Sequence, residues 1–166
     1  VVAHNDAYGG ESKKIALLGH SAGAHLVALT GTNATFLTNV GLKLSDLKGV
    51  ASIATEGYDV RQQIQGNNAT YINAFGTNIG PNIHASPIYN LISGVSYPHF
   101  FIAKRGTASR IATADRFITG LQQRGAQVDQ VNGSIYTHSG INAAIGSPGE
   151  TVITVPLVNF LRTFFR

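Results

Sequence analysis

Cysteine, methionine and tryptophan are absent from the 166 residues. The lack of cysteine excludes disulfides, zinc–thiolate sites, iron–sulfur clusters and cysteine nucleophiles. No apolar run approaches the ~20 residues that a membrane span needs. Charged residues make up only 12% of the chain, and the net charge of +4 reflects few acids rather than clustered bases. The composition therefore favours one globular domain over residues 1–166, with no membrane span and no nucleic-acid partner.

Four segments of strand length, the first three of them largely apolar, recur along the chain, separated by segments of helical character. The strand-like segments are residues 13–18, 47–54, 98–103 and 127–131. Because strands that alternate with helices connect by right-handed crossovers, this pattern predicts an α/β fold with a mostly parallel sheet flanked by helices.

Three segments are typical of helices. They are residues 22–30, residues 111–121, and a C-terminal segment with Leu157, Phe160, Leu161 and Phe164 on one face. We expect Ser109 to cap the second helix, with Gly125 after its end, and Thr151 or Thr154 to cap the third.

Residues 57–96 have a different character. They are rich in Asn, Gly, Ile and Tyr and show no sustained periodicity. We predict an irregular excursion with short helical turns above the sheet, where pockets of α/β proteins form. Tyr71, Phe75 and Tyr89 either line a pocket there or serve as ordinary packing.

The segment Gly19–Gly23 (GHSAG) matches the pattern G-x-S-x-G. It follows a predicted buried strand and opens a predicted helix, which is the setting of a nucleophile elbow. The small residues Gly19, Ala22 and Gly23 allow the strand and helix to approach closely. We therefore predict that Ser21 is a nucleophile and that the Ala22 backbone N–H donates to an oxyanion. The alternatives are a tightly packed turn or a phosphate-binding loop.

A serine nucleophile needs a base, and His138 is the best placed of the six histidines. It lies after the last predicted strand and before the C-terminal helix, which is where proteins with a nucleophile elbow place the base. His20 and His25 flank the elbow, His4 is near the start of the chain, and the remaining two lie in the excursion and in a strand. We predict a loop around His138.

These features resemble the C-terminal two-thirds of carboxylesterase/lipase-type α/β-hydrolases, of the small-esterase and formamidase kind. The segments that carry the resemblance are Tyr8–Glu11, Gly19–Leu26, Tyr58–Val60, Ala85–Ile88 and His138–Gly146. The resemblance implies hydrolysis of small carboxylic esters, with attack by Ser21 and with His138 as base and then acid. It implies no cofactor and no metal.

The sequence departs from this family in the acid that orients the histidine. The family commonly has Asp or Glu after the third strand, where this chain has Ser109. Some members have the acid after the preceding strand, where Glu56 is the nearest carboxylate and Asp59 the next. Asp115 is better read as a solvated helix charge. We predict Glu56 as the acid, with the absence of an acid as the alternative.

A second departure concerns the strands that precede the elbow strand in the family. Their HGGG-type loop, which completes the oxyanion hole, is absent from this sequence. The resemblance therefore implies a partial fold in which the N-terminal strands are missing, leaving an apolar edge at residues 15–18. Either the chain is a piece of a longer protein, which we favour, or a second chain or a homo-oligomer completes the sheet.

Overall fold

The computed structural model describes residues 4–11 and 14–165 and contains a four-stranded sheet. In both chain order and spatial order the strands are β1 (Ile15–His20), β2 (Leu47–Ile53), β3 (His99–Lys104) and β4 (Val128–Asn132). All three neighbouring pairs are parallel, with Gly19 beside Ser52 and Val50 beside Phe100. The four predicted strands are confirmed, although Lys13, where we expected the first to begin, lies outside the described residues.

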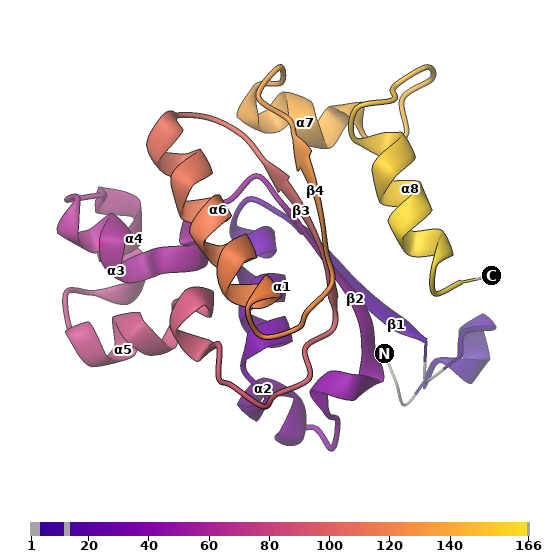
Figure 1. Ribbon diagram of the computed structural model, residues 1–166, viewed down its shortest axis with the longest axis horizontal. Coiled ribbons are helices and arrows are strands. Elements are labelled where there is room, and N and C mark those ends of the chain that lie inside the picture. Colours follow the sequence, from indigo (N-terminus) through magenta and orange to yellow (C-terminus); the bar gives the residue numbers. More distant parts are fainter. Residues whose placement is uncertain (1–3, 12–13, 166) are drawn as a thin grey trace.

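Helices cover both faces of this sheet, so the molecule has three layers (Figure 1). One face carries α1 (Ala22–Thr32) and α6 (Ala108–Gln122), and the other carries α7 (His138–Ala144) and α8 (Thr154–Arg162). None of the helices in the described part of the chain has the length and apolarity that a membrane crossing requires.

Two hydrophobic cores lie between the layers, because successive side chains of a strand point to opposite faces. Phe100 and Ile102 of β3 pack in the first core with Phe117 of α6. Phe101, between them in sequence, packs in the second core with Phe160 of α8. Since both faces of the central strands β2 and β3 are buried, these two strands read as nearly continuous apolar runs rather than as alternating ones.

The predicted excursion at 57–96 consists of short helices joined by tight turns. They are η4 (Gly57–Asp59), α3 (Val60–Gln65), α4 (Ala69–Phe75), α5 (Ile79–His84) and η5 (Pro87–Asn90). The side chains of Asp59, Asn68 and Asn78 accept hydrogen bonds from the first turns of α3, α4 and α5. The Asn-rich composition that suggested irregular structure therefore supplies helix caps.

Polar contacts tie this segment to the rest of the domain. The buried Asp59 carboxylate pairs with Arg116 of α6 at 2.6 Å. The Ser86 hydroxyl donates to the Asn82 carbonyl and accepts from the Val60 N–H. These contacts hold α3 to α5 and η5, and they give structural roles to two of the segments that carried the family resemblance.

Three sequence expectations about helix ends were wrong. Thr107, not Ser109, caps α6. No threonine caps α8; instead, the Glu150 carboxylate accepts hydrogen bonds from the N–H groups of residues 152–154. His138 lies not in a loop but at the start of α7, whose seven residues are too few for a clear apolar period.

The remaining short helical segments are η2 (Asp6–Tyr8), α2 (Thr35–Thr38) and η3 (Leu44–Asp46). Leu37 of α2 and Leu44 of η3 are buried in the first core. On the outer side of β1, the described residues provide no further strand. Leu18 of this edge strand is 49% exposed.

Candidate active site

Ser21 occupies the sharp turn between β1 and α1. Its backbone has φ 57° and ψ −118°, a conformation that residues other than glycine rarely adopt. The Ser21 N–H donates to the Ile53 carbonyl at 3.0 Å, and its carbonyl accepts from the His25 N–H at 3.2 Å. The residue is thus held by the end of β2 on one side and by the first turn of α1 on the other, and this over-determined environment maintains the strain.

Gly19 makes this turn possible. A Cβ at this position would lie 2.2 Å from the Gly23 carbonyl oxygen, closer than any real contact. At Gly23 itself, a Cβ would meet nothing within 4 Å. Of the two glycines in the predicted motif, only the first is required by the close approach of strand and helix.

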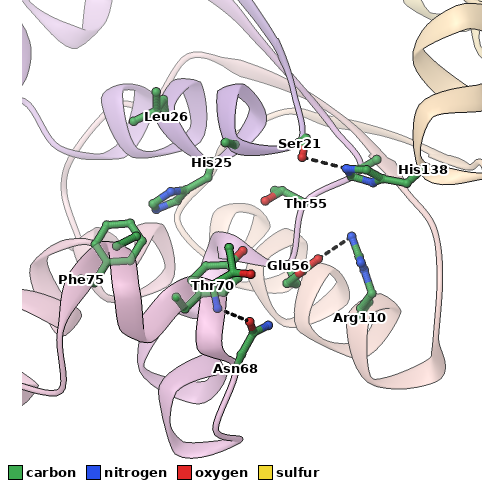
Figure 2. A pocket seen from close by; sticks show the side chains of 14 residues that line it. Ser21, His25, Leu26, Thr55, Glu56, Asn68, Thr70, Phe75, Arg110 and His138 are labelled. Carbon is green, nitrogen blue, oxygen red and sulfur yellow. Dashed lines mark hydrogen bonds and ion pairs between the residues drawn. The ribbon is translucent and has the colours of Figure 1, made fainter.

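His138 lies 117 positions after Ser21 in the chain, yet its side chain reaches the turn between β1 and α1. Its Nε2 lies 2.8 Å from the Ser21 Oγ (Figure 2). For the serine hydroxyl to donate, this nitrogen must be unprotonated, which places the proton of the neutral ring on Nδ1. The structure therefore brings the two residues together in the geometry that a nucleophile and its general base require.

His20, the residue before the serine, holds the backbone of His138. Its Nε2 donates to the His138 carbonyl at 2.8 Å, and the two rings lie 4.8 Å apart between centroids. This contact joins the end of β1 to the start of α7. Sequence reasoning noted that His20 flanks the elbow but did not predict this contact, which no local pattern indicates.

The surroundings of His138 favour its neutral form. Burial lowers its pKa below the usual histidine value, and the charges of His20, Arg110 and Arg105 lower it further, while Glu56 opposes them. An unprotonated imidazole at neutral pH can accept the serine proton.

Glu56, the predicted acid, lines one cavity together with His138 but is not bonded to it. Its carboxylate forms an ion pair with Arg110 of α6. Within residues 4–11 and 14–165, no carboxylate forms a hydrogen bond or ion pair with His138. Arg110 was not predicted as a site residue, although it lies in the segment where the family acid was sought.

A cavity of about 320 Å³ opens beside Ser21. His25, Leu26 and Phe75 lie at one end, and Glu56 and Arg110 lie at the other, near His138 (Figure 2).

Of the three aromatic residues considered for a pocket, Tyr71 and Phe75 line the cavity. The Tyr89 hydroxyl instead donates a hydrogen bond to the Asp59 carboxylate. Burial raises the pKa of Tyr71 to about 12, and the Glu56 carboxylate acts in the same direction, so its hydroxyl remains protonated.

The apolar end of the cavity is built around His25. This buried side chain hydrogen bonds through Nε2 to the Ala85 carbonyl at 2.7 Å and packs edge-on against Phe75. Burial lowers its pKa, against the opposing effect of that hydrogen bond, so the ring is neutral and donates. His25 therefore shapes the pocket rather than serving as a base.

Ala22, the predicted oxyanion donor, is the first residue of α1 and lines the cavity beside Ser21. The first N–H groups of a helix have no intrahelical acceptor and lie at its positive end. No three His, Asp or Glu side chains of the described chain are grouped to hold a metal ion.

The strained serine between a parallel strand and a helix, together with the distant histidine, is the arrangement of an α/β-hydrolase fold. No protein-family model matches the chain, and no curated protein matches its sequence. Esterase B from Lactobacillus rhamnosis has a similar structure, with a TM-score of 0.69 at 12% identity, over 99% of this chain and 58% of that one.

Two further solved structures agree. The esterase Est2 of Thermogutta terrifontis has a TM-score of 0.68 at 20% identity, covering 96% of this chain and 57% of that one. An arylesterase has a TM-score of 0.64 at 17% identity, covering 99% and 57%. The predicted partial α/β-hydrolase fold is confirmed, and the chain spans less than three-fifths of the length of these esterases.

Proposed function

We propose that this chain carries the catalytic dyad of a serine hydrolase that cleaves small carboxylic esters through an acyl-enzyme. The observation that carries the proposal is the 2.8 Å contact between the Ser21 Oγ and the His138 Nε2 at a strained elbow. The similarity to three esterase structures supports the same chemistry.

In the first half of the reaction, His138 takes the proton of Ser21 as the Oγ attacks the ester carbonyl. Negative charge moves to the carbonyl oxygen, where the Ala22 N–H at the positive end of α1 stabilises it. The tetrahedral intermediate then expels the alcohol, which receives the proton from His138. Water, activated by His138 in the same way, hydrolyses the acyl-enzyme.

The cavity supports a preference for short acyl groups. Its volume of about 320 Å³ is at the small end of ligand pockets. Leu26 and Phe75 provide apolar surface for the acyl chain at a distance from the charged pair of Glu56 and Arg110.

A second candidate is a hydrolase-like protein that binds a ligand without turnover. The absence of a bonded carboxylate at His138 among the described residues favours it, because loss of the orienting acid from a triad lowers kcat by about 10⁴-fold. The two candidates differ in whether Ser21 reacts.

The experiment uses a fluorophosphonate probe and nitrophenyl acetate. We expect the probe to label Ser21, and we expect Ser21→Ala to abolish labelling and to lower hydrolysis by about 10³-fold or more. Ser139→Ala, at an exposed serine beside the base, is the matched control and should keep both. A folded protein that neither reacts with the probe nor hydrolyses the ester would refute esterase function and favour the binding protein.

A further inference from the structure

The cavity contains an ion pair that the proposed reaction does not use. Glu56 follows β2 and Arg110 lies in the first turn of α6, and their side chains are only 18% and 26% exposed. Among the described residues that line the cavity, Glu56 is the one carboxylate. A partly buried charge pair therefore lies close to Ser21 and His138, and in the part of the chain that the structure describes no carboxylate is bonded to His138.

Protonation of His138 during acyl transfer creates a cation in unfavourable surroundings. The charged or titratable groups that act on its ring are His20 at the end of β1, Arg105 after β3, Arg110 on α6 and Glu56 after β2. Three of these groups are basic and oppose the imidazolium. Glu56 lines the same cavity as His138 (Figure 2), and it alone among these groups favours the imidazolium. Its position therefore affects the energy of the transition state.

Arg110 keeps Glu56 in its place. The guanidinium binds the carboxylate, while its Nε is buried and has no hydrogen-bond partner. A Cβ on Gly106 would lie 2.9 Å from the Arg110 Cδ, so the side chain packs against a glycine with φ +104°. The turn after β3 thus leaves room for the arginine where the family would place an acid.

We propose that Glu56 and Arg110 act together as positioning residues for the dyad: Glu56 supplies the negative charge that stabilises protonated His138, and Arg110 restrains this charge from reaching the imidazole. The inference rests on the proposed function of Ser21 and His138. In the reaction, the Ser21 O–H bond breaks as the bond from Oγ to the acyl carbon forms. The proton moves to the His138 Nε2 and later to the leaving alcohol, while Glu56 and Arg110 keep their protonation states.

The first measurement does not depend on turnover. The pKa of His138 is followed by NMR of the histidine rings in the Ser21→Ala protein, with the resonance assigned by its loss in His138→Gln. Glu56→Gln should lower this pKa and Arg110→Gln should raise it, each by about half a unit for charges near a protein surface.

The restraint by Arg110 is tested by combining the variants. Once Arg110→Gln frees the carboxylate, Glu56→Gln should lower the pKa by at least about twice as much as it does in the presence of Arg110. Arg105→Gln is the matched control, because it removes a neighbouring positive charge without releasing Glu56. In the Arg105→Gln protein, Glu56→Gln should lower the pKa of His138 by the same amount as it does when Arg105 is present. If Glu56→Gln shifts the pKa of His138 by the same amount or less in the Arg110→Gln protein than in the presence of Arg110, the proposal that Arg110 restrains Glu56 is wrong.

The second measurement is the pH profile of kcat for nitrophenyl acetate in proteins that retain Ser21. The acidic limb should move with the NMR pKa of each variant, and Glu56→Gln should lower kcat several-fold with little change in KM. An unmoved His138 pKa in folded variants would overturn the inference while leaving esterase function intact. Shifted pKa values in a protein without any turnover would instead refute the proposed function.

Discussion

The close approach of β1 and α1 makes Gly19→Ala the most informative substitution in this protein. The added Cβ would lie 2.2 Å from the Gly23 carbonyl oxygen and 2.8 Å from the Ala24 nitrogen. Both are backbone atoms, so no side chain can rotate away. Strand and helix must separate by about 1 Å to reach van der Waals contact.

This separation should affect activity more than folding. Overpacking of this kind costs about 1–3 kcal/mol of stability. Displacement of a reacting group by about 1 Å lowers the rate by about 10²-fold. We therefore expect Gly19→Ala to fold with a reduced melting temperature. It should hydrolyse nitrophenyl acetate about 10²-fold more slowly, because the Ser21 Oγ is displaced from the His138 Nε2.

Gly23→Ala is the control, because its Cβ would meet nothing within 4 Å and alanine is favoured in a helix. This variant should retain activity. Its melting temperature, measured by circular dichroism, should equal or slightly exceed that of the wild type. The rate of fluorophosphonate labelling reports on the serine independently of substrate binding. If the probe labels Gly19→Ala at the wild-type rate, or if both variants lose activity equally, the close approach of β1 and α1 at Gly19 does not position Ser21.

Two further predictions concern the loop before α8 and the acyl pocket. Desolvation alone would raise the pKa of Glu150, but hydrogen bonds from Thr154, Tyr136 and Ile153 lower it from 4.5 to about 2. The carboxylate therefore stabilises the fold above about pH 4.5, and this contribution is lost as the pH falls to about 2. Glu150→Ala should lower the free energy of unfolding at neutral pH by about 1–3 kcal/mol. Urea denaturation should show its difference from wild type vanishing toward pH 2; a pH-independent difference would contradict the role of the charge. Phe75→Ala should enlarge the cavity and raise kcat/KM for nitrophenyl hexanoate relative to the acetate, since each further buried methylene contributes about 0.8 kcal/mol, or about fourfold. An unchanged ratio across the ester series would place the acyl chain elsewhere.

The layered architecture was predictable because its signals are local. Buried parallel strands are continuous apolar runs, and the longest helix, α6, shows its apolar face at Phe117, Ile118 and Leu121. Helix ends were less predictable. The N–H groups at the start of α8 donate to the carboxylate of Glu150, which lies upstream of the usual cap position.

The excursion at 57–96 could not be assigned from periodicity, since helices of six or seven residues make fewer than two turns. Its order comes instead from Asx caps and from contacts such as Asp59 with Arg116. Such pairs depend on where two distant segments pack, which composition does not reveal.

By itself, the sequence determined the α/β class and the tight turn that carries Ser21, because a strand, a turn and a helix are specified by adjacent residues. It predicted His138 as the base from its place after the last strand. Only the tertiary structure decided what surrounds that pair. His20 supports the His138 backbone, and Glu56 binds Arg110 instead of the imidazole. The physical reason is that hydrogen bonds and ion pairs depend on separations of a few ångströms between strand ends, and these separations are set by the packing of the whole sheet and its helices.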